Sequence, residues 1–140
     1  MQHQVEAVKL GAFAIFVGAC MTGTETDVIV TTDVPCSSIS NAIVSLSGAQ
    51  TVLACSGAGD FGIAVYHPTD TQTEVEVVAT VDGSDPNSCF GATPQPGCII
   101  ARKHAPVSYQ TNVPVELEQA CAGLVCPQNQ TCSHAVCVAE

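Results

Sequence analysis

Cysteine is the residue that most constrains how this chain can fold. The 140-residue sequence contains nine cysteines: Cys20 stands alone near the N-terminus, and the other eight form an even set further along. An even set of cysteines in a short chain predicts a disulfide framework and an oxidising compartment. Each bridge contributes about 2 to 4 kcal/mol. We expect this contribution to matter, because four phenylalanines, two tyrosines and no tryptophan provide few large core side chains.

The segment before Cys20 has the pattern of an export signal. Residues 10–17 form an apolar run too short to span a bilayer, and small residues follow it where a signal peptidase cuts. The sequence Val17-Gly18-Ala19-Cys20 resembles the lipobox of bacterial lipoproteins. This resemblance implies that diacylglycerol is attached to Cys20, which becomes the first residue of the mature protein. By the sorting rule of the same family, Met21 implies the outer membrane.

An ordinary export signal is the alternative. The first nine residues offer Lys9 as a positive charge and carry Glu6 against it, and a cut after Ala19 without lipidation would leave Cys20 as an unpaired thiol. In both interpretations residues 1–19 are the signal peptide, and the small polar residues 20–26 form a short tether. The protein is then a lipid-anchored component of the cell envelope or, in the alternative, a secreted protein.

The charge of the mature chain excludes several kinds of partner. Without residues 1–19, twelve acidic residues face Arg102 and Lys103, so the net charge stays at −10. A surface of this sign repels nucleic acids and anionic lipid headgroups. We therefore expect no nucleic-acid partner, and membrane contact only through the anchor.

The remaining sequence is typical of strands and turns. Short segments recur at regular intervals between Gly, Pro, Asp and Ser, a pattern found in sandwiches and barrels. These segments are 27–32, 42–47, 51–55, 61–67, 74–81, 98–103 and 112–118. We predict that residues 27–119 form an all-β domain, a seven-stranded antiparallel β-sandwich of immunoglobulin-like or transthyretin-like type.

Three segments alternate between apolar and polar residues, as strands with one buried face do. The rows expected in the core are Val75, Val77, Ala79 and Val81; Val113, Val115 and Leu117; and Phe61, Ile63 and Val65. In the second row, the intervening Pro114 indicates an edge strand or a bulge.

Residues 120–140 are predicted to form a small disulfide-rich tail. Four cysteines lie within 17 residues, with four, five and four residues between them and a proline after the second. This spacing resembles the first half of an EGF-like module. The resemblance implies interlaced bridges, Cys121 to Cys132 and Cys126 to Cys137.

The four cysteines of the larger domain flank neighbouring segments. Cys36 and Cys55 lie on either side of two predicted strands, and Cys89 and Cys98 bracket a loop rich in Gly and Pro. Hairpins bring such positions together, so we favour pairing within each couple, although eight cysteines allow 105 connectivities.

Residues capable of chemistry are few and scattered. Asp82, Asp85 and Asn87 offer three oxygen ligands in one turn and are a weak calcium candidate, without the ligand spacing of an EF-hand. A plain turn is the competing interpretation. The mature histidines, His67, His104 and His134, stand apart in sequence, and no nucleophile motif is present. We predict no enzyme and no cofactor.

The anchor, the strand domain and the tail together resemble cell-envelope lipoproteins of Gram-negative bacteria. The residues that support this are Val17 to Cys20, the stretch Thr32-Asp33-Val34-Pro35 and the cysteine pattern of the tail. The resemblance implies location and architecture. We expect a non-catalytic binding or structural module whose partner is an envelope protein or a glycan, in an oligomeric state that the sequence leaves open. The alternatives are an inhibitor of a hydrolase or protease acting through the loop between Cys89 and Cys98, and a weak calcium-dependent adhesion module.

Overall fold

The computed structural model is an all-β molecule. It describes residues 24–68, 72–91, 93–106 and 110–140, which form nine strands in three sheets, together with three single 3-10 turns and no longer helix. The strands are β1 (Glu25–Thr32), β2 (Ala42–Leu46), β3 (Ala49–Leu53), β4 (Asp60–Tyr66), β5 (Gln72–Thr80), β6 (Cys98–Pro106), β7 (Gln110–Leu117), β8 (Gln130–Ser133) and β9 (Val136–Ala139). The 3-10 turns are η1 (Cys36–Ser38), η2 (Pro86–Cys89) and η3 (Gln119–Cys121).

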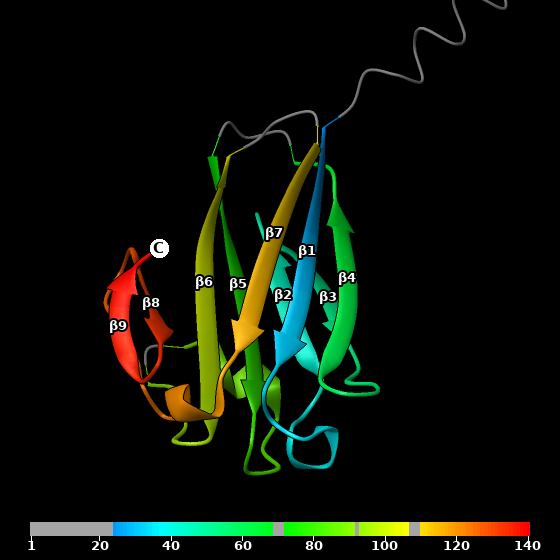
Figure 1. Cartoon of the computed structure of the whole chain (residues 1–140). Coiled ribbons are helices and arrows are strands. Elements are labelled where there is room, and N and C mark those ends of the chain that lie inside the picture. The colour runs from blue at the N-terminus through cyan, green and yellow to red at the C-terminus, as the bar shows by residue number, and fades with distance from the viewer. Residues whose placement is uncertain (1–23, 69–71, 92, 107–109) are drawn as a thin grey trace, which may run out of the picture.

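Two sheets make up the body of the protein and face each other in a sandwich-like arrangement (Figure 1). One has the order β4-β1-β7 and the other β3-β2-β5-β6. Strands β8 and β9 form a separate hairpin beside β6 (Figure 1).

The prediction of seven antiparallel strands is corrected in two respects. Seven strands do form the two larger sheets, but the tail contributes two more. In addition, β1 and β7 run parallel, with Ile29 opposite Pro114. Alternation in a sequence indicates which side chains are buried, but it carries no information about the direction of the neighbouring strand.

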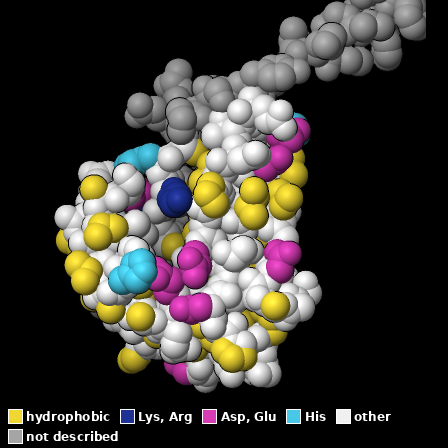
Figure 2. All heavy atoms as spheres, in the orientation of Figure 1, with side chains coloured by type: hydrophobic (Ala, Val, Ile, Leu, Met, Phe, Trp, Pro, Cys, Tyr) yellow, Lys and Arg dark blue, Asp and Glu magenta, His cyan; other side chains and the backbone are white. Residues whose placement is uncertain are grey.

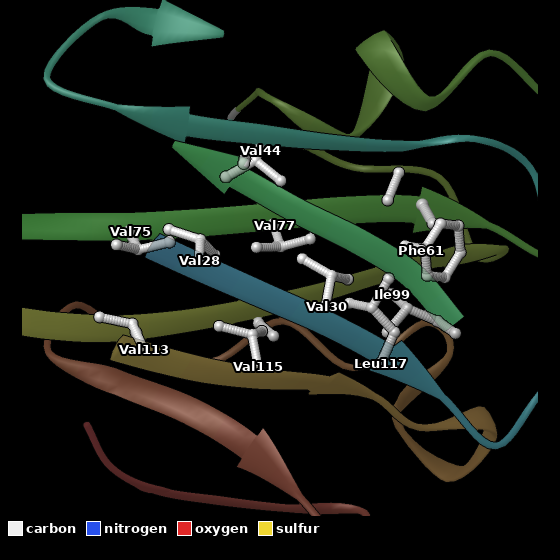
Figure 3. Close-up of a cluster of buried hydrophobic side chains, with 14 of the residues drawn as sticks. Val28, Val30, Val44, Phe61, Val75, Val77, Ile99, Val113, Val115 and Leu117 are labelled. Carbon is white, nitrogen blue, oxygen red and sulfur yellow. The ribbon is translucent and has the colours of Figure 1, made fainter. Parts of the chain in front are cut away.

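The core lies between the two larger sheets and consists mainly of valine. Its residues include Val28, Val30, Val44, Val75, Val77, Ile99, Val113, Val115 and Leu117 (Figure 3). The predicted rows in β5 and β7 are confirmed, since Val75, Val77 and Ala79 and then Val113, Val115 and Leu117 are buried. Val81, the last member of the β5 row, is only partly buried.

The predicted row in β4 is wrong after its first residue. Phe61 is buried as expected, but Ile63 and Val65 are 53% and 51% exposed, while Ala64 and Tyr66 are buried instead. The register with β1 shifts by one residue here, because Gly62 lies opposite Val30 but Asp60 lies opposite Thr31. Such a bulge inserts one residue, and a one-residue shift exchanges the two faces of a strand.

The bulge is held by local geometry. Gly62 has a φ of +89°, and its N–H donates a 2.7 Å hydrogen bond to Asp60 Oδ1. The new register turns Tyr66 inward, where its hydroxyl lies 3.0 Å from the Val44 carbonyl oxygen and 2.8 Å from Thr51 Oγ1. Burial raises the pKa of Tyr66, against the smaller opposite effect of the Thr51 hydrogen bond. Tyr66 thereby links the two larger sheets.

The tail packs against the body of the protein. Cys121 and Cys132 are 2% and 6% exposed and belong to the main core. The exposed edge of β6 is partly covered, because the Arg102 N–H donates to Thr131 Oγ1 at 2.9 Å and the Gly123 N–H donates to the Cys98 carbonyl at 2.8 Å. A covered edge is protected from pairing with another chain.

Four disulfides join the cysteines in the predicted pairs. They are Cys36–Cys55, Cys89–Cys98, Cys121–Cys132 and Cys126–Cys137. The first joins η1, before β2, to the segment after β3, the second closes the η2 loop, and the last two hold the tail. Cys20 lies outside the described residues.

Two glycines near the bulge should differ in their tolerance of alanine. Gly59 and Gly62 have similar φ values of +90° and +89°, but a Cβ at Gly62 has open space, whereas a Cβ at Gly59 would overlap the carbonyl oxygen of Thr32. Gly62→Ala should cost about 1 to 2 kcal/mol of unfolding free energy. Gly59→Ala should cost about 1 to 3 kcal/mol more, because the backbone must also move. Urea unfolding of the two variants compares the costs, and equal costs would contradict the packing at Gly59.

Candidate functional site

The outer face of the three-stranded sheet carries a continuous apolar row. Ile29 of β1 lies opposite Ile63 of β4 and Pro114 of β7, and Val65 follows on the same face of β4. Figure 2 shows hydrophobic side chains gathered on this face, over the strands β7, β1 and β4 of Figure 1. We call Ile29, Ile63, Val65 and Pro114 the apolar row. A contiguous exposed apolar patch of this kind marks interaction surfaces more often than scattered residues do.

Carboxylates lie around the apolar row, and Lys103 of β6 lines a hollow beside β7 together with Glu116. Asp27 lies opposite Val65, and Glu116 lies opposite Thr31 on the other side of β1. Of the basic residues in the described ranges, Arg102 and Lys103 both belong to β6, so β1, β4 and β7 contribute none. A surface that combines aliphatic side chains with carboxylates is suited to a protein that presents apolar groups beside lysine or arginine.

The outer face of β5 and β6 carries charges instead. Glu76 and Arg102 are cross-strand neighbours, and Arg102 Nε donates to Glu76 Oε2 at 2.8 Å. The same guanidinium donates through Nη1 to the Cys126 carbonyl at 3.2 Å. Arg102 therefore connects the sheet to the tail, and its positive charge is engaged by Glu76.

Two residues further along these strands, on the same face, three groups meet that are far apart in sequence. Glu74 lies opposite His104, and Glu140 approaches them from the tail. One ligand-type atom from each residue lies within 4.8 Å of those of the other two, and His104 Nε2 is 3.3 Å from Glu140 Oε2. We call Glu74, His104 and Glu140 the carboxylate–histidine cluster. Carboxylate oxygen and imidazole nitrogen are both metal ligands, so these residues could hold a metal ion.

Glu140 is the unusual member of this cluster. Its side chain has no exposed surface, and neither carboxylate oxygen accepts a hydrogen bond from a fixed donor. Burial raises the pKa of Glu140, and the neighbouring Glu74 raises it further. A hydrogen bond between the two carboxyl groups requires one of them to be protonated.

A hollow of about 240 Å³ opens beside the cluster. It is lined by Glu74, Glu76 and Arg102 from the sheet and by Cys126, Gln128 and Asn129 from the tail. The tail therefore forms one wall of this polar site.

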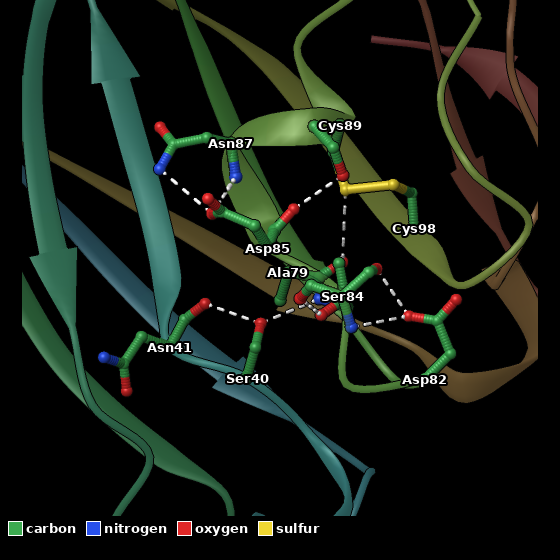
Figure 4. Close-up of a disulfide and its surroundings, with 11 residues drawn as sticks. Ser40, Asn41, Ala79, Asp82, Ser84, Asp85, Asn87, Cys89 and Cys98 are labelled. Carbon is green, nitrogen blue, oxygen red and sulfur yellow. Dashed lines mark hydrogen bonds between the residues drawn. A yellow bond between two sulfur atoms is a disulfide. The ribbon is translucent and has the colours of Figure 1, made fainter.

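The residues of the calcium prediction are engaged in local hydrogen bonds (Figure 4). Asp82 Oδ1 accepts from the Ser84 N–H at 3.1 Å and from Ser84 Oγ at 2.5 Å, and the side-chain bond is the main cause of the lowered pKa of Asp82. Asp85 Oδ1 accepts from the Asn87 N–H and caps η2. One oxygen of each carboxylate thus stabilises the turn, and the calcium site stays a prediction.

The loop considered for an inhibitor is closed by the Cys89–Cys98 disulfide, whose two cysteines are each 2% exposed (Figure 4). Pro96 is exposed, but its carbonyl oxygen lies close to Gly123. A Cβ added at Gly123 would press against this oxygen. The loop is therefore supported by the tail on one side.

The other two histidines in the described ranges, His67 and His134, make local contacts. His134 Nδ1 is 3.0 Å from Ser133 Oγ, and its Nε2 is 4.0 Å from Glu118 Oε1. The second distance is too long for a hydrogen bond, and the His134 side chain is 89% exposed. His67 Nδ1 lies 2.9 Å from the Thr24 carbonyl oxygen.

Sequence reasoning missed both surfaces. From the sequence alone, no role is assigned to Glu74, His104 stands apart, and Ile63 and Val65 are predicted to lie in the core. The opposition of Glu74 and His104 could have been found by extending segment 98–103 to His104 and pairing it with segment 74–81. The approach of Glu140 depends on how the tail packs, which no local pattern indicates.

Glu140 makes the stability of the fold depend on pH. Its raised pKa means that the folded state holds the proton more tightly than the unfolded state, where the ordinary value is 4.5. This contribution is fully present below that value and is lost as the pH rises through the folded pKa. In chelator-containing buffer, urea unfolding of the wild type and Glu140→Gln between pH 3.5 and 8 should therefore show the wild type losing stability relative to the variant as the pH rises. Parallel curves would contradict the burial of this carboxyl.

None of the helical turns in the described ranges is long and apolar enough to cross a membrane. No family model matches this chain, and comparisons with curated proteins and with solved structures found no significant match.

Proposed function

We propose that this protein is a non-catalytic binding module of the bacterial cell envelope, lipid-anchored through Cys20, and that the apolar row binds another protein. The observation that carries the proposal is the outward orientation of Ile63 and Val65, which are 53% and 51% exposed beside Ile29. The bulge at Gly62 keeps them outside the core. A partner that covers these two aliphatic side chains removes their apolar surface from water, which favours binding.

The chemistry of this face defines the partner. Aliphatic side chains offer no hydrogen bonds to sugar hydroxyl groups, so a protein fits the apolar row better than a glycan does. The nearby carboxylates of Asp27 and Glu116 favour a partner surface with lysine or arginine around an apolar centre. The net charge of −10 opposes association with a second copy of the chain.

Several features support the proposed location. Four disulfides favour an oxidising compartment. The apolar segment and the sequence ending at Cys20 favour lipoprotein export to the outer membrane, with plain secretion as the alternative. A rigid cross-linked fold on a short tether suits a module that presents a binding face at the membrane surface.

We also propose finer assignments for the two parts of the chain. In immunoglobulin domains the early strands of one sheet are paired in the order ABED. The arrangement here, with β1 between β4 and β7, favours the transthyretin-like type of sandwich. The interlaced bridges Cys121–Cys132 and Cys126–Cys137 support an EGF-like tail.

Introducing a charge in the apolar row should abolish binding to the partner. Wild-type protein and Ile63→Asp are used to capture proteins from envelope extract, and a protein lost with Ile63→Asp is identified, purified and measured against both forms. We expect at least a tenfold loss of affinity in the variant, because an aspartate would be desolvated against apolar groups. The affinity of the wild type should fall with added salt, since the partner is basic.

Val52→Asp is the matched control, because Val52 is 62% exposed but lies on β3 of the other sheet. It should bind as the wild type does. Equal binding by Ile63→Asp, or a self-association in light scattering that Ile63→Asp removes, would overturn the assignment of this face to a basic protein partner.

The anchor is tested separately by intact mass. Protein purified from Gram-negative membranes should begin at Cys20 and carry the added mass of lipid. Reduction should add eight hydrogens, two for each of the four disulfides. A chain that begins at residue 20 without lipid would select the secreted alternative.

A further inference from the structure

The three residues of the carboxylate–histidine cluster do not balance one another's charges, and His104 and Glu140 lie further apart than a hydrogen-bonded ion pair. The Glu140 side chain is fully covered, and within the described part of the chain neither of its carboxylate oxygens accepts a hydrogen bond from a fixed donor. Burying a carboxylate without a partner is costly. His104 can add at most one positive charge against the two carboxyl groups of Glu74 and Glu140. Arg102 is close, but it is bonded to Glu76 at 2.8 Å.

The distances in the cluster suit a metal ion better than an ion pair. A charge-assisted N–H···O hydrogen bond is about 2.7 to 2.9 Å long, whereas His104 Nε2 and Glu140 Oε2 are 3.3 Å apart. Two ligand atoms bound at about 2.0 to 2.1 Å to a tetrahedral zinc ion lie about 3.3 Å from each other. The third ligand atom, from Glu74, is within 4.8 Å of both. Glu74 is exposed, so a change of side-chain rotamer can complete the set.

We infer that Glu74, His104 and Glu140 form a binding site for a divalent zinc-class metal ion. This inference goes beyond the proposed function, and it uses a different face of the molecule. Imidazole nitrogen and carboxylate oxygen are both zinc ligands, so a set of one imidazole and two carboxylates can bind zinc. Calcium is disfavoured, because it takes six to eight oxygen ligands and has little affinity for imidazole.

Three protein ligands leave one tetrahedral position open. His104 is 52% exposed, and the neighbouring hollow of about 240 Å³ gives solvent or a ligand from a partner access to the site. The metal ion would also join the tail to the sheet, because Glu140 follows β9 whereas Glu74 and His104 belong to β5 and β6. The ion would neutralise the buried Glu140 carboxylate in place, which the protein residues alone do not.

Calorimetric titration of the disulfide-bonded, chelator-treated protein with zinc chloride at pH 7.5 tests the inference. We expect one ion per chain, and a melting temperature that rises with zinc. Because loss of groups that only support metal ligands typically costs 10- to 100-fold in affinity, His104→Gln and Glu140→Gln should each weaken binding by at least about tenfold. Calcium chloride should give no comparable binding.

His134→Gln is the matched control. His134 is also an exposed histidine near a glutamate, at 4.0 Å from Glu118, but it has no buried second carboxylate. This variant should bind zinc as the wild type does. Cys20 is present in every variant and cannot account for a difference between them. No binding, unchanged binding in His104→Gln, an equal loss in His134→Gln or equal affinity for calcium would each overturn the inference. Should Glu140→Gln fail to fold, His104→Gln alone tests the inference, because His104 is exposed.

Discussion

The position of β1 between β4 and β7 is the constraint on which the rest of the structure depends. Its inward residues Val28 and Val30 are fully buried at the centre of the core. Its outward Ile29 is matched by Ile63 on one side and Pro114 on the other. The register of β1 therefore determines which side chains enter the core and which lie together on the outer face of the three-stranded sheet. Strand β1 pairs with β4 and with β7, the last strand of the domain. The pairing of β1 with β7 closes a long stretch of chain, which carries a large entropic cost.

The bulge in β4 shows how one backbone feature determines both packing and surface. Without it, strict alternation from Phe61 would bury Ile63 and Val65 and expose Tyr66. With it, Tyr66 bridges the two larger sheets through Val44 and Thr51. The bulge therefore exposes the β-branched side chains of Ile63 and Val65 and buries the ring of Tyr66, whose hydroxyl forms hydrogen bonds. In a monomer that does not bind a partner through this face, burying the two aliphatic side chains would be more stabilising.

The sequence predicted those features that depend on local patterns. The strand positions, the rows of β5 and β7 and the two disulfides of the larger domain follow from alternation, turn residues and short separations along the chain. The two disulfides of the tail are those that the EGF-like resemblance implies. The predicted core row in β4 was wrong because a glycine in a strand can either continue the strand or mark a bulge. The apolar pattern around Gly62 is the same in both cases. The parallel pairing of β1 with β7 and the meeting of Glu140 with His104 depend on tertiary packing across about 85 and 36 residues respectively, where periodicity carries no signal.

The two proposed surfaces belong to different sheets of the molecule, and this separation affects how they can act. The apolar row lies on the outer face of β4-β1-β7, whereas Glu74 and His104 lie on the outer face of β5 and β6, with the core of Val75 and Val77 between them. A protein bound to the row would leave the carboxylate–histidine cluster open to solvent. The cluster lies instead against the tail, through Glu140. Arg102 already fixes the tail to β6, and Cys121 and Cys132 belong to the core. Metal binding would therefore stiffen the tail without competing for the partner, so a ternary complex is the arrangement that this geometry permits.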